Sequence, residues 1–146
     1  MNQFSPTLSQ GARASQSGKS LENKIESVLQ ELDLEYEAQV NFTNIYNRPT
    51  AKMDFYVPAY NMYMEVKNQN VAGSVDEKIP FCIANLLKVD GRGVFIYGGS
   101  HFNTPRGQSI INYAIDKTLD SDVEIVHEAN LKDFLSEQTS SGQTPQ

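Results

Sequence analysis

The chain has 146 residues, 39 % of them hydrophobic and 21 % charged, and this length predicts one domain with a sizeable core. No apolar run approaches the roughly 18 residues of a membrane helix and the N-terminus does not resemble a secretory signal, so we expect a cytoplasmic protein. The formal net charge of -6 argues against a protein held to nucleic acid by bulk attraction, although cations gathered in one cleft would still suffice.

Both ends of the chain are rich in Ser, Gln and Gly. This composition predicts flexible tails at residues 1–19 and 137–146 around a single domain at residues 20–136. We find no internal repeat and no heptad pattern in that domain.

Hydrophobic periodicity and turn residues predict nine elements in the domain. In chain order we expect a helix at 21–32, strands at 36–42, 51–57 and 62–67, a helix at 76–88, a strand in GVFIYGG, a helix at 106–118, a strand at 123–127 and a helix at 130–136. The order α-β-β-β-α-β-α-β-α predicts an α/β fold in which helices flank a mixed β-sheet.

The segment MYMEVKNQN places Glu65 and Lys67 on one face of a strand, two positions apart. In MDFYVP, Asp54 lies within an otherwise apolar strand, where burial without partners would be unfavourable. If strands 51–57 and 62–67 form a hairpin, Asp54 comes close to Glu65, with Lys67 further along the same face. We therefore expect two carboxylates and an amine to converge.

This trio has two interpretations. Two hard oxygen ligands on adjacent strands suit Mg²⁺, with Mn²⁺ as a substitute, and such a metal would polarise a phosphate while Lys67 orients a water. That arrangement is typical of metal-assisted phosphodiester hydrolysis. Alternatively, the trio is a surface patch of ion pairs, each contributing only about 0.2–1 kcal/mol. The spacing alone leaves both interpretations open.

The motif formed by Asp54, ten further residues and then Glu65-Val66-Lys67 resembles the PD-(D/E)XK nuclease superfamily, although Met53 stands where the family name has Pro. The superfamily includes restriction enzymes, homing endonucleases and phage junction-resolving endonucleases. The resemblance implies a restriction-endonuclease-like core and a DNA substrate. It also implies that Asp54 and Glu65 bind the metal together with the Val66 backbone carbonyl, and that Lys67 positions the attacking water.

Two flanking segments extend this resemblance over residues 18–100. SGKSLENKIESVL is similar to the first helix of the superfamily, where a glutamate completes the acidic cluster; Glu22 is the better match and Glu26 the alternative. KNQNVAGSVDEKIPF is similar to a segment of phage and restriction-type members, in which a Gly-Ser turn leads into a helix. This second segment implies substrate contacts by Gln69, Ser74 and Lys78.

Other residues are expected around the site or in the core. Arg48 and Lys52 flank the entry to the hairpin, and Arg106 lies in the turn-rich YGGSHFNTPRG, so we expect all three to contact DNA. In the same loop, His101 is expected to face solvent. The single cysteine, Cys82, lies in the apolar IPFCIANLL and is expected to be a buried hydrophobe rather than a nucleophile.

Together these expectations describe a Mg²⁺-dependent DNA endonuclease, site-specific and of homing or restriction type, from a phage or a bacterium. A Holliday-junction-resolving endonuclease is the alternative, and a non-catalytic nucleic-acid-binding module on the same fold is the second alternative. Because one such domain cuts one strand, a cut through both strands predicts a homodimer or a higher homo-oligomer.

Overall fold

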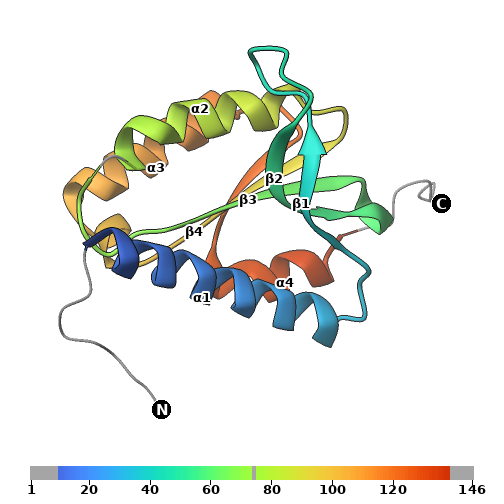
Figure 1. Ribbon diagram of the computed structural model, residues 1–146, viewed down its shortest axis with the longest axis horizontal. Coiled ribbons are helices and arrows are strands. Elements are labelled where there is room, and N and C mark those ends of the chain that lie inside the picture. The colour runs from blue at the N-terminus through green and yellow to red at the C-terminus, as the bar shows by residue number, and fades with distance from the viewer. Residues whose placement is uncertain (1–9, 74, 139–146) are drawn as a thin grey trace.

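The structure, a computed structural model, describes residues 10–73 and 75–138 (Figure 1). Within these ranges the elements are α1 (Gln10–Glu31), β1 (Glu37–Phe42), β2 (Ala51–Val57), β3 (Met62–Asn68), α2 (Val75–Lys88), β4 (Arg92–Gly98), α3 (Pro105–Lys117), β5 (Val123–His127) and α4 (Leu131–Ser136). This order confirms the predicted α/β arrangement. The main difference is that α1 begins at Gln10 rather than near residue 21, because Ala, Arg, Gln and Lys favour helix among the Ser and Gly residues that suggested a tail.

The five strands form one mixed sheet in the order β1-β2-β3-β4-β5. The pairs β1/β2 and β2/β3 are antiparallel, whereas β3/β4 and β4/β5 are parallel. Helices α1 and α4 cover one face, and α2 and α3 cover the other (Figure 1). Among the described residues, no helix is both long and apolar enough to cross a membrane.

The core lies in two layers, one on each side of the sheet. Ile25 and Leu29 of α1 pack against the strands on the first side, and Ile79 and Ile83 of α2 pack on the second. Strand β4 is buried on both faces, as is usual for a parallel strand between two helical layers. This burial gives a rigid support to β3, the neighbouring central strand, which with β2 carries the predicted site residues.

The β1–β2 ribbon bends in its middle. Met53 packs in the α2-side core, whereas Phe55, only two residues later, packs in the α1-side core. Between them, Asp54 lies across from Gln39, whose φ of 52° is in the left-handed region. A left-handed residue inside a strand redirects the chain, so the bend carries the outer half of the ribbon over α2 and leaves Asp54 at the corner.

Candidate active site

The pairing of β2 with β3 ends immediately before Asp54 and Glu65. The last paired residues are Phe55 and Met64, and beyond them the Asp54 carboxylate Oδ2 accepts the Val66 backbone N–H at 2.8 Å. A side chain thus takes the place of the next strand-to-strand bond. The two strands open around this carboxylate, and the convergence expected from the sequence is present.

Glu65 is partly buried beside Asp54. Burial, a hydrogen bond with Asp54 and the charge of Asp54 together raise the pKa of Glu65 to about 9. The pair therefore retains a proton at a pH well above the ordinary pKa of a carboxyl group, because two hydrogen-bonded carboxyl groups do not both ionise easily. A cation placed between them would remove that penalty.

Lys67 follows on the same face of β3. Burial disfavours the charge of its ammonium group, but Cys82 and the three carboxyl groups nearby outweigh burial and raise the pKa of Lys67. The thiol of Cys82 is neutral at ordinary pH, so the negative charge retained by the Asp54–Glu65 pair and by Glu22 is what holds the amine in its charged form. Lys67 is thus a cation fixed at the centre of the site.

Glu22 reaches this group from α1. Burial, followed by the charges of Asp54 and Glu26, raises the pKa of Glu22, and Lys67 lowers it. Glu22 therefore faces the same centre. Glu26 points elsewhere, since its carboxylate accepts a hydrogen bond from the Tyr36 hydroxyl at 3.1 Å. We refer to the group that the structure brings together as the acid–lysine cluster, which consists of Glu22, Asp54, Glu65 and Lys67.

Two further residues contact the cluster, and sequence reasoning missed both. Gln39 Nε2 lies 3.4 Å from Asp54 Oδ1, so each oxygen of Asp54 faces a donor. Cys82 of α2 donates its thiol hydrogen to Glu65, and burial raises the pKa of that thiol to about 12. Cys82 is indeed buried, as expected, and the apolar stripe of α2 is the one signal that could have directed it toward β3.

The remaining predicted residues are more dispersed. The Gln69 side chain folds back to donate to the Val71 carbonyl at 2.7 Å, which satisfies its own loop rather than extending the face of Glu65. Lys78, Arg48 and Lys52 are exposed on α2, on the β1–β2 loop and on β2. Ser74 lies outside the described residues. Contacts of these side chains with DNA stay predictions.

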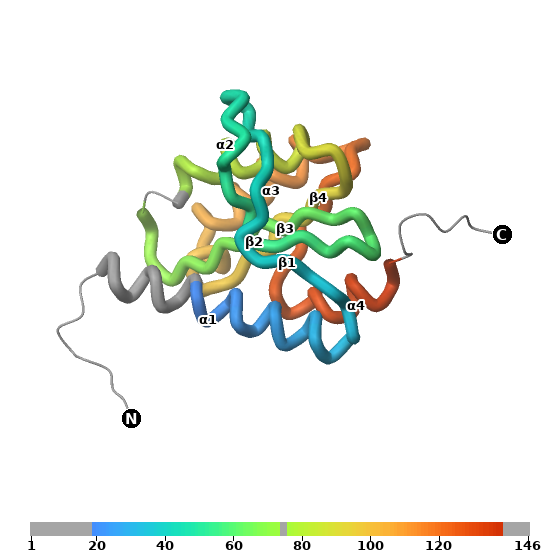
Figure 2. Tube along the Cα trace, turned by 45° about the vertical axis from the view of Figure 1, so that its right-hand side comes forward, coloured from blue at the N-terminus to red at the C-terminus, as the bar shows by residue number. Residues whose placement is uncertain are grey.

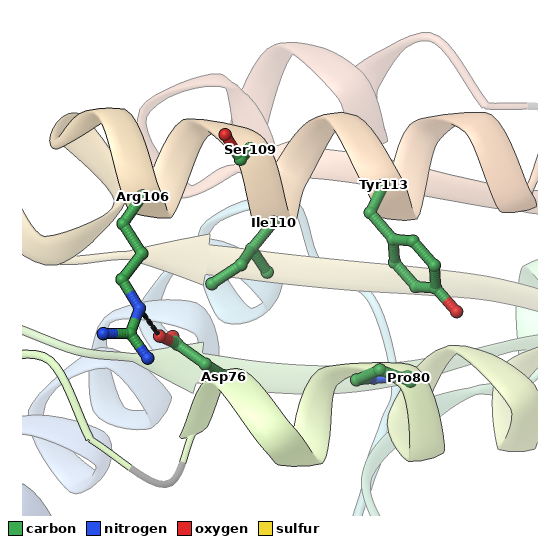
Figure 3. A pocket seen from close by; sticks show the side chains of 6 residues that line it. All are labelled: Asp76, Pro80, Arg106, Ser109, Ile110 and Tyr113. Atoms are coloured by element: carbon green, nitrogen blue, oxygen red, sulfur yellow. Dashed lines mark ion pairs between the residues drawn. The ribbon is translucent and has the colours of Figure 1, made fainter.

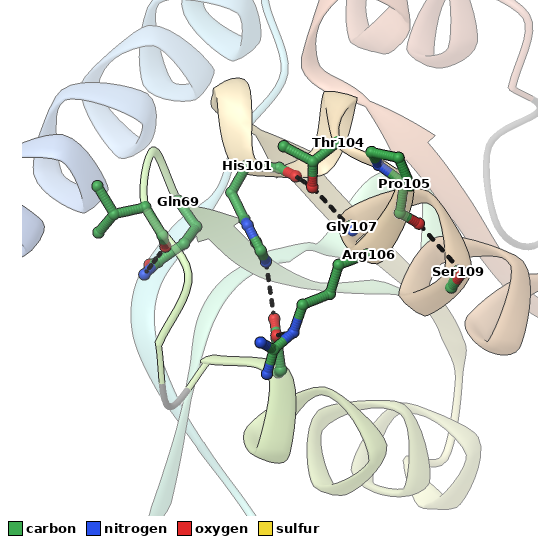
Figure 4. Close-up of polar contacts among 9 residues, drawn as sticks. Gln69, His101, Thr104, Pro105, Arg106, Gly107 and Ser109 are labelled. Atoms are coloured by element: carbon green, nitrogen blue, oxygen red, sulfur yellow. Dashed lines mark hydrogen bonds and ion pairs between the residues drawn. The ribbon is translucent and has the colours of Figure 1, made fainter.

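His101 does not face solvent, contrary to the expectation. Only 3 % of it is exposed, and its Nε2 lies 2.9 Å from Asp76 Oδ1. The other carboxylate oxygen of Asp76 lies 2.6 Å from Arg106 Nε, as an ion pair rather than an aligned hydrogen bond (Figure 3). His101 and Arg106 approach this point from the same loop-to-helix segment (Figure 4). We call these three residues the Asp76 cluster.

The loop before His101 is held tightly against the end of β3. Gly99 has a φ of 97°, and a Cβ atom there would lie 2.2 Å from the Gln69 carbonyl oxygen. The Gln69 carbonyl instead accepts the His101 backbone N–H at 3.0 Å. Only glycine fits this approach, so the segment that immediately follows Lys67 is fastened to the Asp76 cluster.

The residues of the acid–lysine cluster fit a hard divalent cation of the Mg²⁺ type. No group of three or more His, Cys, Asp or Glu residues in the described ranges is arranged to hold a metal ion by itself. Mg²⁺ does not require such a cage, because it usually takes one or two carboxylates and fills its octahedron with water and substrate phosphate oxygens. Asp54 and Glu65 supply two such carboxylates, with only one lysine nearby to balance their charge.

A family model described as a PD-(D/E)XK nuclease superfamily domain matches residues 13–140. The chain belongs to the PD-(D/E)XK nuclease superfamily. No curated protein and no solved structure matches it. The family match confirms the resemblance found in the sequence, and it identifies the chain as a nuclease domain, whose substrate class is nucleic acid. In this PD-(D/E)XK domain, the motif residues Asp54, Glu65 and Lys67 are the ones that meet where β2 and β3 open.

Proposed function

We propose that this PD-(D/E)XK protein is a Mg²⁺-dependent DNA endonuclease that hydrolyses phosphodiester bonds at the acid–lysine cluster. The observation that carries the proposal is the imbalance of charge in that cluster. Three carboxyl groups surround a single lysine, and burial, a hydrogen bond with Asp54 and the charge of Asp54 together raise the pKa of Glu65 by more than Lys67 lowers it. A site built to receive a divalent cation has this imbalance before the cation binds.

Asp54, Glu65 and the Val66 backbone carbonyl would hold the metal. The Val66 N–H points at Asp54, and the N–H and C=O of one strand residue point to the same side, so its carbonyl faces the same opening. When bound, Mg²⁺ would polarise a phosphate oxygen and make a water more acidic. Mn²⁺ has similar ligand preferences and would substitute.

The chain's own residues would position the reactants. Lys67, held in its charged form, would orient the attacking water and stabilise negative charge on the phosphate oxygens. The water oxygen would form a bond to phosphorus and lose a proton to solvent, while the bond to the leaving sugar oxygen breaks and that oxygen takes up a proton from solvent; the phosphorus centre is inverted. Glu22 would accept a hydrogen bond from water around the metal, since its carboxyl group faces Asp54 and Lys67.

Basic and polar residues on several elements of the domain are proposed to contact the DNA backbone. They are Arg48, Lys52, Gln69, Lys78 and Arg106, with Ser74 as a further candidate from the sequence. A cut through both strands would require two active sites, hence a homodimer or a larger assembly. The free cysteine, Cys82, suits the reducing cytoplasm, which we propose as the compartment.

Two kinds of DNA substrate are proposed. The sequence resemblance favours a defined site, as for a homing or restriction-type enzyme of a phage or a bacterium. The second candidate is a four-way junction, which an exposed aromatic side chain near the site favours, as described below. A non-catalytic binding module is the rival, and it would retain DNA binding without cleavage.

The experiment is cleavage of end-labelled DNA, offered as a long duplex of mixed sequence and as a four-way junction, in Mg²⁺ or in EDTA. Wild type is compared with Asp54→Ala and Lys67→Ala. Matched controls are Asp116→Ala and Lys117→Ala, the same two substitutions at exposed positions of α3.

We expect cleavage in Mg²⁺ only, lost in both site variants and retained in both controls. Cleavage that persists in EDTA would refute the metal requirement, and cleavage by Asp54→Ala would refute the site. Binding without cleavage of either DNA, together with no Mg²⁺ binding at Asp54 and Glu65, would establish the non-catalytic module instead.

A further inference from the structure

The loop at the outer end of the β1–β2 ribbon, residues 43–50, is built unusually firmly for an exposed turn. Four polar side chains are buried among the described residues, and two of them, Asn44 and Asn85, hold this loop. Asn44 Oδ1 accepts the backbone N–H groups of Tyr46 and Arg48, at 2.9 and 3.1 Å. The turn is therefore closed from within by a side chain.

The same loop is fastened to α2. Asn85 Oδ1 accepts the Ile45 N–H at 3.0 Å, and Lys88 Nζ lies 3.4 Å from the Thr43 carbonyl oxygen. Buried amides that are bonded in this way fix one conformation, because leaving either group unpaired would be unfavourable. Figure 2 shows the ribbon and its loop rising beyond the sheet beside α2.

What this firm loop presents is an aromatic ring. Tyr46 is 67 % exposed, more than any other large hydrophobic side chain in the described ranges. One face of its ring stacks on Phe81 of α2, with centroids 5.5 Å apart and an angle of 24° between the planes. The stack holds the ring in place and leaves its other face open.

Basic residues lie close to Tyr46 in the sequence or on the helix face of its stacking partner Phe81. Lys78, Phe81 and Lys88 lie on one face of α2, three and seven residues apart, and Arg48 follows Tyr46 by two residues. Neither Arg48 nor Lys78 takes part in any of the ion pairs that the described residues form. In a chain of net charge -6, positive charges beside an exposed ring complement a phosphate backbone with a base between its phosphates.

The base of the loop also lies near the acid–lysine cluster along β2. Ala51, the first residue after the loop, is three positions before Asp54, which is about 10 Å along a strand. This equals the rise of about three base pairs of duplex, at roughly 3.4 Å each. A DNA strand that runs along β2 from the acid–lysine cluster would therefore reach the loop within a few nucleotides.

From these observations we infer that residues 43–50 form a second DNA contact, in which Tyr46 stacks on an unstacked base a few nucleotides from the cut while Arg48 and Lys78 bind the flanking phosphates. This inference rests on the proposed nuclease function. It specifies the substrate as DNA that already exposes a base, as a bulge or a branch point does. In a continuous duplex each base is stacked on its neighbours and would have to be extruded first.

The chain contains no tryptophan, so Tyr46→Trp introduces a single indole as a reporter. Its fluorescence is titrated in EDTA, which prevents cleavage, with a four-way junction, a duplex bearing a one-base bulge and the continuous duplex. Tyr113→Trp is the matched control, because Tyr113 is an exposed tyrosine of α3 that takes no part in the stack of Tyr46 on Phe81. Binding of labelled junction is measured in parallel for wild type, Tyr46→Phe, Tyr46→Ala and Tyr113→Ala.

We expect junction and bulge to quench the indole at position 46 strongly, the continuous duplex to quench it weakly and the indole at 113 to stay unchanged. Tyr46→Ala should weaken junction binding about tenfold, whereas Tyr46→Phe and Tyr113→Ala should bind as wild type does. Equal quenching at positions 46 and 113, or equal quenching by junction and continuous duplex, would overturn the inference.

The two proposals fail in different ways. If wild type cuts DNA in Mg²⁺ but the indole at position 46 does not respond, residues 43–50 are not a DNA contact and the nuclease assignment stands. If the indole responds to junction but wild type cuts nothing, the loop binds DNA and the proposed catalytic function is wrong.

Discussion

Two charged clusters border α2, and they are balanced differently. The acid–lysine cluster, which α2 touches through Cys82, gathers three carboxyl groups around one ammonium group. The Asp76 cluster, at the start of α2, gives one carboxylate a basic partner on each oxygen, His101 Nε2 at 2.9 Å and Arg106 Nε at 2.6 Å. The first cluster lacks positive charge, and the second does not.

This difference in charge balance is what we expect between a site that binds a ligand and a site that stabilises the fold. A carboxylate with partners on both oxygens stabilises its surroundings and has little left to offer a substrate. The fold holds the carboxyl groups of the acid–lysine cluster close together although their negative charges would repel each other. Such unfavourable arrangements of charge are common at functional sites. We therefore propose that the acid–lysine cluster carries the chemistry and that the Asp76 cluster anchors the fold.

The largest effect is expected from neutralising a carboxylate of the acid–lysine cluster. Glu65→Gln should lower the rate of DNA cleavage at least about a hundredfold, because the amide cannot ionise to bind Mg²⁺ as the carboxyl group would. It should not lower the melting temperature of the metal-free protein, since the amide resembles the protonated carboxyl group. Glu124→Gln, the same change at an exposed position of β5, is the control. A Glu65→Gln variant that unfolds readily but cuts normally would reverse the roles of the two clusters.

The opposite pattern is expected in the Asp76 cluster. Asp76→Asn should lower the free energy of unfolding by about 2–3 kcal/mol, because the buried His101 and the nearby Arg106 lose their charged partner. Cleavage measured well below the melting temperature should stay within a few-fold of wild type. Glu77→Gln, at the next and exposed position, should change neither quantity. Denaturant unfolding measures the predicted loss of stability, and single-turnover cleavage measures the predicted retention of activity.

Stability should depend on pH through Glu65. Its pKa is raised above the unfolded value, so the folded protein binds the extra proton, and stability falls as pH rises from about 4.5 toward about 9. In EDTA we expect the melting temperature to drop by about 5 °C more in wild type than in Glu65→Gln between pH 5 and pH 8.5. Mg²⁺ at pH 8.5 should recover most of this loss in wild type only. Parallel melting curves of the two proteins would contradict the account.

The smallest effect is expected at Gln39, the left-handed residue opposite Asp54. Gln39→Gly relieves the backbone strain and should raise stability by about 1 kcal/mol. It also removes the donor to Asp54 Oδ1 and should slow cleavage about three- to tenfold. Asp33→Gly relieves a similar φ of 57° away from the site, so it should raise stability without slowing cleavage. Gln39→Asn, which tolerates the left-handed region, separates the contribution of the amide from that of the strain.

The sequence predicted the elements and the motif because both depend on local pattern. Alternation and turn residues placed β2 and β3 to within one residue, and the hairpin then brought Asp54 to Glu65. The charge imbalance at the site follows directly from those two carboxylates and Lys67. None of this required knowledge of which helix covers which face.

The rest depends on contacts between segments distant in the sequence. The sequence around Cys82 predicts an ordinary core residue, and only the packing of α2 shows its contact with Glu65. The sequence around His101 predicts a loop residue, and only the fold shows Asp76, 25 positions away, beside it. The left-handed conformation of Gln39 has no sequence signal, because glutamine rarely adopts it. The environments of Cys82 and His101 are set by residues that only the packing of the fold brings close to them.

The central claim is that the acid–lysine cluster is a metal-dependent catalytic centre, and the most direct test is the single-turnover rate of DNA cleavage against Mg²⁺ concentration. It should be measured for wild type, Asp54→Asn and Asp76→Asn on whichever DNA wild type cuts. The account predicts a rate that saturates with Mg²⁺ in wild type and Asp76→Asn and is lost at every Mg²⁺ concentration in Asp54→Asn. A Mg²⁺-dependent rate that survives in Asp54→Asn and disappears in Asp76→Asn would contradict it.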